Sequence, residues 1–495
     1  MSSTSEQLSS QSTYRINDKV LTMATLNPHI ANIEYAVRGP IVIRAAEIEN
    51  ELKKGVPKPF KQVIRANIGD CHACGQKPLT FIRQVVALCT YPDLMDNPHF
   101  NDDAKQRARR ILDDCRGHSI GSYSDSIGID VVRHDVARYI SERDGGIPSN
   151  PDDIFLSTGA SEGIKAVMKL LVTGRDSPIA GIMLPVPVYP LYTALLAEFN
   201  TYPILYYLNE EKNWSLDTEE LERALNLAKP HCIPRALVVI NPGNPTGQVL
   251  KEENIKKIIQ FAKRNNIFLL ADEVYQHNIY GKDSEFHSFK KVMKSMGGEY
   301  EKMELASFMS TSKGYMGECG YRGGYCELIN IDPEVKYHLL KSLSAKLCPS
   351  VTGQAAMGVV VNPPRPGEPS YRQFISEKDH VLGELKEKAQ LTSRLLNEIE
   401  GITCNEVEGA MYAFPRIWLP PKAIEAAKEK NMEPDSMYCT ELLEATGICV
   451  VPGSGFGQKP GTYHFRMTIL PSVQELQELL RLFAVFHESF MIKYQ

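Results

Sequence analysis

Residues 310–324 (STSKGYMGECGYRGG) hold the most unusual set of chemically active side chains in the sequence. A single lysine, Lys313, stands among small, hydroxylated and glycine residues, and Arg322 follows nine positions later. A lysine amine is a nucleophile towards carbonyl carbons, and a guanidinium pairs with carboxylate or phosphate groups. The alternative is a solvated basic loop, for which this composition is unusual.

Three further segments place polar groups directly after apolar runs: residues 158–162 (TGASE), 241–247 (NPGNPTG) and 272–275 (DEVY). Taken singly, they have ordinary interpretations as a helix N-cap, a proline–glycine loop and a surface turn. A helix N-terminus that follows small residues is also an anion-binding site. The four segments together, in this order, favour a functional site.

The elements that must position these segments follow an alternating pattern. Residues 154–157, 236–240 and 267–271 are apolar throughout, which predicts strands buried on both faces. Apolar residues at helical spacing follow in 164–171 and 255–262, so amphipathic helices join the strands. This pattern predicts a parallel α/β sheet, in which ligands gather beyond the carboxyl ends of the strands.

The proline-rich stretch 362–369 ends the first pattern, because a helix cannot continue through it. Leucine and isoleucine at helical spacing then predict a long amphipathic helix over 376–400. The remainder reads as a smaller α/β unit. The predicted organisation is an N-terminal arm (1–30), the N-terminal part of a small domain (31–100), a large domain (101–349) and the C-terminal part of the small domain (350–495).

Composition excludes several classes of protein. A length of 495 residues fits about three average domains or a two-domain enzyme equally well. A net charge of −5 argues against a nucleic-acid footprint, and no apolar run approaches the ~18 residues of a membrane span. The 11 cysteines favour free thiols in a reducing compartment. Residues 1–12 have no signal-peptide core, so the cytoplasm is expected, with a weak organellar signal as the alternative.

The four segments as a set resemble the fold-type I aminotransferases, which use pyridoxal 5′-phosphate (PLP). The similarity covers nearly the whole chain, and it implies a large, mostly parallel seven-stranded sheet domain with a smaller α/β domain. Within that group, residues 34–40, 64–70, 312–325 and 450–457 are similar to the alanine aminotransferases. The spacing from Lys313 to Arg322 is one longer than in most of the superfamily but is normal for this subgroup.

The resemblance implies a role for each motif residue. Lys313 binds the cofactor aldehyde and later moves a proton, as general base and then acid. Asp272 faces the ring nitrogen and keeps it protonated, and both Asn244 and Tyr275 bind the 3′-oxygen. The residues implied to hold the phosphate are Ala160, Ser161, Ser310 and Arg322.

Two tyrosines and the substrate ligands complete the implied site. Tyr189 stacks on the ring, with a packed core tyrosine as the alternative. Tyr123 reaches the phosphate of the neighbouring subunit, which implies a homodimer. Arg466 clamps the substrate α-carboxylate, to which Gly69 adds a backbone contact. With substrate ligands in the small domain and cofactor ligands in the large one, the domains are expected to close on binding.

The expected partners are small-molecule amino acids and 2-oxo acids, with no nucleic acid and no membrane. The expected reaction converts L-alanine and 2-oxoglutarate to pyruvate and L-glutamate by a ping-pong mechanism. The main alternative is a glutamate–glyoxylate or broader-specificity aminotransferase. A lyase of the same fold and a PLP-binding regulator without turnover are less favoured alternatives. Arg38 is a candidate for the distal carboxylate, although a structural salt bridge is the ordinary interpretation.

Two motifs suggest other chemistry but fit it poorly. Residues 71–74 (CHAC) have C-x-x-C spacing without a second pair, so no metal site is expected. Residues 453–457 (GSGFG) lack the spacing and the following helix of a dinucleotide loop, and are interpreted as a turn on the substrate side.

Overall fold

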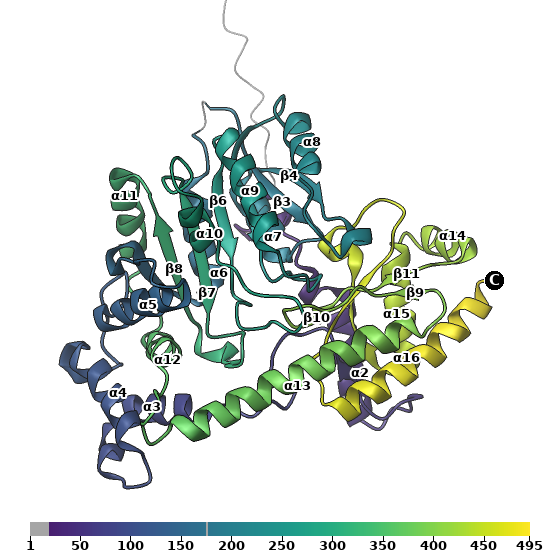
Figure 1. Ribbon diagram of the computed structural model, residues 1–495. Helices are drawn as coiled ribbons and strands as arrows, with labels where there is room; N and C mark the ends of the chain where they lie inside the picture. The colour runs from purple at the N-terminus through teal and green to yellow at the C-terminus, as the bar shows by residue number, and fades with distance from the viewer. Residues whose placement is uncertain (1–18, 175–176) are drawn as a thin grey trace, which may run out of the picture.

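A seven-stranded sheet forms the centre of the larger part of the molecule, in a computed structural model that describes residues 19–174 and 177–495 (Figure 1). Its strand order is β2-β8-β7-β6-β5-β3-β4. Only β8 runs antiparallel to its two neighbours, so the predicted mostly parallel sheet is confirmed. The strands are β2 (Ile154–Thr158), β3 (Ala180–Val186), β4 (Tyr202–Tyr207), β5 (Ile233–Ile240), β6 (Phe268–Asp272), β7 (Leu305–Ser310) and β8 (Gly323–Ile329).

Helices cover both faces of this sheet because both faces of each central strand are apolar. In β5, Leu237 and Val239 pack against one helical layer, whereas Val238 and Ile240 pack against the other. The first layer contains α8 (Thr218–Ala228), α9 (Glu252–Arg264) and α10 (Phe289–Met296). The second contains α6 (Gly159–Leu170), α7 (Pro190–Phe199) and α11 (Pro333–Ser344).

A smaller α/β unit lies beside the sheet domain and combines two distant parts of the chain (Figure 1). Strand β1 (Ile64–Arg65) pairs in parallel with β12 (Ile448–Cys449). Strand β14 (Phe465–Thr468) pairs with β10 (Tyr412–Ala413) and β13 (Val451–Pro452). The remaining elements here are α2 (Pro40–Lys53), β9 (Ile402–Thr403), β11 (Arg416–Ile417), α14 (Pro421–Glu429), α15 (Pro434–Thr446) and α16 (Val473–Lys493).

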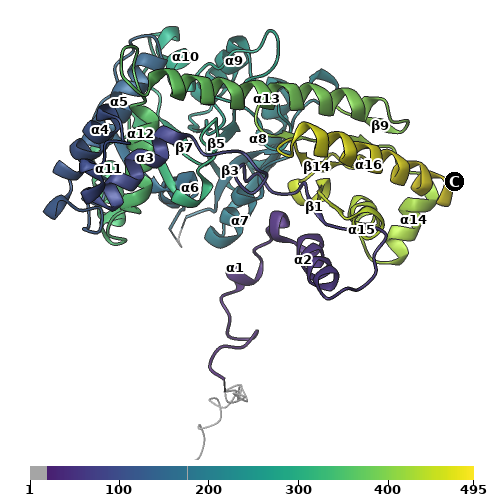
Figure 2. The ribbon, with the colours of Figure 1, turned by 90° about the horizontal axis from the view of Figure 1, so that it is seen from below.

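The predicted long helix is present as α13 (Tyr371–Asn397), which runs from the sheet side of the molecule to the smaller unit (Figures 1 and 2). It begins earlier than predicted because Phe374 extends its buried face. It ends before 400, and Gly401 adopts a left-handed conformation (φ 85°) just beyond it.

Two helices pack across the predicted domain limits. Helix α3 (Thr80–Thr90) and helix α12 (Val351–Val361) pack together, and they also contact α4 (Asp102–Asp113), α5 (Asp130–Arg143) and β8. Residues 80–90 and 351–361 therefore contact elements that we assigned to the large domain. The division into domains itself stays a prediction.

The N-terminal segment leaves the body of the molecule (Figure 2). Residues 1–18 of the predicted arm lie outside the described residues. In the rest, α1 (Pro28–Ala31) lies against α7, and Val20, Leu21 and Met23 are exposed.

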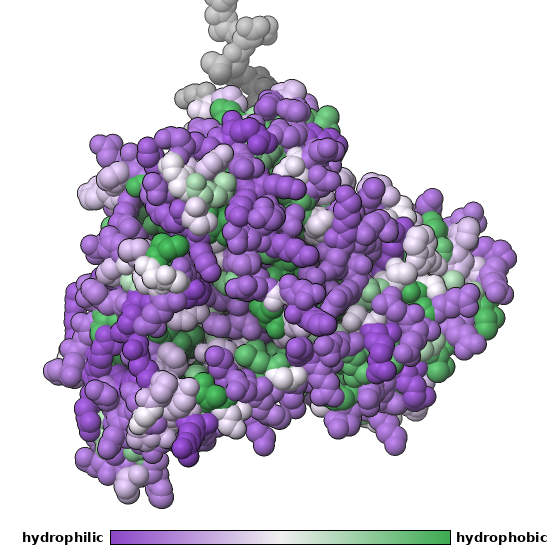
Figure 3. Space-filling view, in the orientation of Figure 1, coloured by the Kyte–Doolittle hydropathy of each residue, from purple (hydrophilic) through white to green (hydrophobic). Residues whose placement is uncertain are grey.

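The length and hydropathy of the helices decide whether any of them could span a membrane. Among the described residues, no helix has the length and hydropathy needed to cross a bilayer. On the face seen in Figure 3, polar residues dominate and apolar residues occur in small groups.

Candidate active site

A cavity of about 470 Å³ opens at the carboxyl ends of the parallel strands, between the sheet domain and the smaller unit. The ends of β2, β5, β6 and β7 each deliver one predicted segment to it. The structure brings together every predicted site residue except Tyr123. The residues that line the cavity include Gly69, Ala160, Ser161, Tyr189, Asn244, Asp272, Tyr275, Ser310, Lys313, Arg322 and Arg466.

Lys313 follows β7 and points into this cavity. Its amine donates to the carbonyl oxygen of Gly69 at 2.7 Å and lies 6.0 Å from the centre of the Tyr275 ring. Burial opposes the charged amine, but the neighbouring Tyr412, Cys319 and Cys71 together outweigh this effect, and the pKa of Lys313 is raised. The surroundings of this amine therefore favour its ammonium form over its neutral form.

Asp272 is the last residue of β6, and its side chain is 4% exposed. The Tyr192 hydroxyl donates to its Oδ2 at 2.9 Å. Burial raises the pKa of Asp272 to about 6, while Tyr192 and Lys313 oppose the rise. A carboxylate placed here favours a cationic partner inside the cavity.

A cradle for an anion lies where β2 leads into α6. The N-terminus of α6 has no side-chain cap, so the backbone N–H groups of its first turn are available. Arg322, in a left-handed conformation, donates to Ser312 Oγ at 3.3 Å, and the amide of Ser312 donates to Ser310 Oγ at 3.0 Å. A Cβ on Gly159 would lie 2.8 Å from Arg322 Cζ, so only glycine leaves the arginine its place.

Arg466 lies in β14 and is 1% exposed. It donates from Nη1 to Asn244 Oδ1 at 3.2 Å and from Nη2 to the carbonyl of Asn67 at 2.7 Å. Its Nε has no partner among the described residues. A buried guanidinium with a free donor at a cavity wall is suited to a carboxylate ligand.

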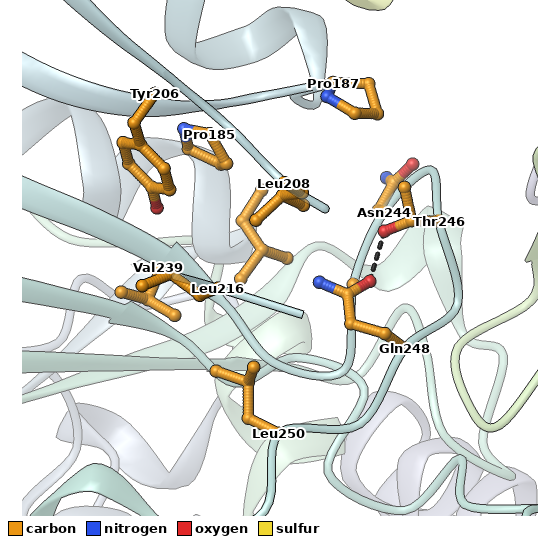
Figure 4. Close-up of a pocket in the computed structure, with 12 residues that line it drawn as sticks. Pro185, Pro187, Tyr206, Leu208, Leu216, Val239, Asn244, Thr246, Gln248 and Leu250 are labelled. Carbon is orange, nitrogen blue, oxygen red and sulfur yellow. Dashed lines mark hydrogen bonds between the residues drawn. The ribbon is translucent and has the colours of Figure 1, made fainter. Parts of the chain in front are cut away.

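The loop 241–247 holds Asn244 in place by packing its underside against the sheet. Figure 4 shows Asn244, Thr246 and Gln248 beside a small cavity, with Tyr206, Leu216 and Leu250 on its apolar side. The Thr246 hydroxyl donates to Gln248 Oε1. Asn244 in this loop points towards the Tyr275 hydroxyl, with 3.5 Å between Nδ2 and Oη.

The remaining predicted residues lie as follows. Tyr189 lines the cavity, and its hydroxyl is 2.7 Å from that of Tyr35. Arg38 is exposed at the cavity wall and forms no ion pair within the described residues. Tyr123 is 65% exposed and does not line this cavity. Phe456, in the predicted substrate-side turn, lies 4.7 Å from Arg466 Cζ, measured to the ring centre.

Sequence reasoning missed two tyrosines that the structure places at the site. Tyr192 follows Tyr189 by three residues. Predicting a helix directly after β3 would have placed Tyr192 on the same side of the chain as Tyr189, and so at the site. Tyr412 carries no local signal, because only the pairing of β10 with β14 brings it next to Arg466. As for metals, the described residues contain no group of three or more His, Cys, Asp or Glu side chains able to hold an ion.

The cavity fits the PLP that the sequence implies. An uncapped helix N-terminus with Arg322 matches a phosphate, a lysine amine matches an aldehyde, and the buried Asp272 matches a cationic ring nitrogen. A Cβ at Gly159 would displace Arg322, so this glycine lets the guanidinium lie against the start of α6, where the two groups together fit an anion.

Comparison with known proteins agrees with this chemistry. The model of the family described as aminotransferase class I and II matches residues 85–483. The chain is 60% identical to alanine aminotransferase 2-like of Danio rerio over 96% of this chain and 87% of that protein. It is 58% identical to alanine aminotransferase 1 of Homo sapiens, over 96% of each. A solved alanine aminotransferase from Pyrococcus furiosus matches with a TM-score of 0.73 and 25% identity, over 94% of this chain and all of that one.

Proposed function

The chain belongs to the class I and II aminotransferases, which depend on PLP, and from that premise we propose that it transfers an amino group between L-alanine and 2-oxoglutarate. The products are pyruvate and L-glutamate, formed in two half-reactions at one site. The observation that carries the proposal is the single cavity shared by Lys313, Asp272 and Arg466, together with relatives of that activity that match nearly the full length.

When bound, PLP supplies an electron sink for negative charge at the substrate Cα. Lys313 Nζ accepts the proton from that carbon and later returns it, as general base and then acid. Asp272 holds a negative charge at the end of β6, where it fits the protonated ring nitrogen. Arg466 orients the amino acid through its α-carboxylate, and burial of Arg466 strengthens this pairing by keeping water out.

An absorption spectrum tests the reaction directly. Adding L-alanine alone to the PLP-loaded protein should abolish the visible band of the lysine-bound cofactor, and 2-oxoglutarate should restore it. Glyoxylate should restore it poorly; recovery as good as with 2-oxoglutarate would favour a glutamate–glyoxylate or broader-specificity enzyme. A band that ignores every amino acid would refute transamination.

Arg38 is proposed to bind the distal carboxylate of 2-oxoglutarate and L-glutamate. Four cationic side chains line the cavity, and Lys313, Arg322 and Arg466 already have proposed tasks. Because Arg38 is exposed and forms no ion pair in the described chain, it is free to meet a dicarboxylate and to leave room for alanine.

The change Arg38→Ala should raise the KM for 2-oxoglutarate by about tenfold or more, because a charged hydrogen-bonded contact is lost, and leave that for alanine nearly unchanged. Arg394→Ala, on the exposed face of α13, is the matched control. Equal increases for both substrates would contradict this assignment.

We further propose a homodimer in which Tyr123 serves the cofactor site of the second subunit. Its exposure outside its own cavity supports this arrangement. Mixed dimers of Tyr123→Phe and Lys313→Ala chains test it: one of the two sites should then combine a native lysine with the native tyrosine of the other chain and bind PLP as in the unmodified protein. Weakened PLP binding at the site with the native lysine would show that Tyr123 serves its own subunit and would contradict the proposal. Cytoplasmic location rests on the sequence composition alone and belongs to the same set of proposals.

A further inference from the structure

Tyr412 stands at the junction of the cofactor and substrate sides of the cavity. It begins β10, where it is the partner of Thr468 in β14, two residues after Arg466. It is 3% exposed and lines the cavity that holds Lys313. It belongs to the smaller unit, whereas Lys313 and Tyr275 follow strands of the large sheet.

The ring of Tyr412 contacts the guanidinium of Arg466. The distance from Arg466 Cζ to the centre of this ring is 4.2 Å, and the ring of Phe456 lies 4.7 Å from the same atom. Aromatic faces attract a guanidinium and restrict its orientation. The two rings therefore fix the plane in which Arg466 meets a carboxylate.

The hydroxyl of Tyr412 faces the catalytic side. The Tyr275 hydroxyl donates to it across 3.4 Å, and Tyr275 in turn faces Asn244 Nδ2 at 3.5 Å. Asn244 Oδ1 accepts from Arg466 Nη1 at 3.2 Å, so the contacts form a closed circuit from Arg466 back to the ring of Tyr412.

The same hydroxyl also lies beside the amine of Lys313. A Cβ built on Gly69 would lie 2.8 Å from Tyr412 Cζ, closer still to its hydroxyl, and 3.2 Å from Lys313 Nζ, so the two groups flank one small volume. Despite burial, the charges of Lys313 and Arg466 lower the pKa of Tyr412. The phenol oxygen of Tyr412 is therefore a hydrogen-bond acceptor placed beside the lysine amine. Other ionisable groups around Lys313 are Asp70, Cys71, Asp272, Tyr275, Cys319 and Arg466.

We propose that Tyr412 is a positioning residue with two separable tasks: its ring orients Arg466 for the substrate carboxylate, and its hydroxyl stabilises the ammonium form of Lys313. The proposal rests on the proposed function for the identity of the substrate but not for the lysine. Through Tyr412, the smaller unit thus helps the sheet domain to set the protonation state of the Lys313 amine.

Two substitutions separate these tasks. Tyr412→Phe keeps the ring and removes the hydroxyl, whereas Tyr412→Leu removes both. Tyr206→Phe is the control, because it removes another buried hydroxyl, bonded to the carbonyl of Val238 at 2.8 Å, away from the lysine.

The first measurement is the rate at which the cofactor-free protein recombines with PLP, followed by absorbance across a pH range. This reaction needs the neutral amine, so the pH midpoint should fall by about half a unit or more in Tyr412→Phe, because the hydroxyl no longer stabilises the ammonium form. Tyr206→Phe should leave it unchanged. An unchanged midpoint in Tyr412→Phe would overturn the role of the hydroxyl, even if alanine proved not to be a substrate.

The second measurement is the KM for L-alanine. It should stay within about twofold in Tyr412→Phe and rise about tenfold or more in Tyr412→Leu, because only leucine removes the ring from Arg466. Equal KM values in the two variants would overturn the role of the ring. If the leucine variant does not fold, a large KM increase in Tyr412→Phe alone would have the same consequence.

Discussion

Replacing Asp272 with asparagine should stabilise the cofactor-free protein at alkaline pH. The carboxyl group is 4% exposed and accepts a hydrogen bond from Tyr192 at 2.9 Å, a contact that an asparagine oxygen preserves. Its surroundings nevertheless favour the protonated form, because burial raises the pKa of Asp272 from 3.8 to about 6.

The size of the effect follows from the two pKa values. Between pH 3.8 and about 6, the folded protein retains a proton that the unfolded chain has lost, so the free energy of unfolding falls as the pH rises through this interval. Above a pH of about 6 the full cost of ionising the buried carboxyl group, about 3 kcal/mol, is subtracted from the free energy of unfolding. Below pH 3.8 this cost disappears. Asparagine does not ionise, so the variant avoids this penalty.

Urea unfolding of the cofactor-free proteins at equal concentration measures the difference. The quantity compared is the free energy of unfolding of Asp272→Asn minus that of the native chain. This difference should be about 3 kcal/mol larger at pH 8 than well below pH 3.8, where the carboxyl group is protonated in both states. At pH 4 it should exceed its low-pH value by less than about 1 kcal/mol. The exposed Asp93→Asn is the control and should show no such dependence. A gain or loss of the same size at both pH values would refute the reasoning. PLP binding, in contrast, should weaken in Asp272→Asn.

Three further substitutions test other parts of the site. Gly159→Ala should weaken PLP binding about tenfold or more, because a Cβ at a φ of 75° would displace Arg322; an unchanged dissociation constant in a fluorescence titration would contradict the cradle. Tyr192→Phe should move the acid limb of the pH–rate profile to higher pH, because the hydrogen bond that lowers the pKa of Asp272 is lost; an unmoved limb would argue against it. Arg466→Lys should raise the KM of alanine and of 2-oxoglutarate together by about tenfold or more, since a lysine lacks the planar fork; an effect on one substrate alone would reject a shared clamp.

Much of the fold could be predicted because the buried strands are apolar at every position. In β5 each residue meets one of two helical layers, and that pattern is visible as the run 236–240. The sequence of β8, in contrast, contains no pattern that indicates its antiparallel direction. That direction depends on how residues 311–322 turn the chain back to run between β7 and β2, which the composition of the strand does not encode.

The candidate site divides in the same way. Lys313 and Asp272 could be found because each directly follows or ends a strand within a recognisable motif, so one local prediction places it. Tyr412 could not, because its position depends on the register of β10 against β14, whose members are far apart in the sequence. A side chain that reaches the site through the pairing of distant strands cannot be assigned to it from a single sequence, whatever its chemistry.

The pairing of β1 with β12 has a consequence for how the protein is made. The segment that carries Gly69 is held by Gly447 and β12, and by Thr468, whose amide donates to the carbonyl of Ala66 at 2.8 Å. Chains emerge from the ribosome N-terminus first, so this segment waits for nearly the whole of translation before its partners exist. The cofactor-binding loops, in contrast, are all present once Arg322 has emerged. A nascent chain therefore contains the groups proposed to bind PLP well before it contains Arg466 and the strands that hold the segment of Gly69 in place.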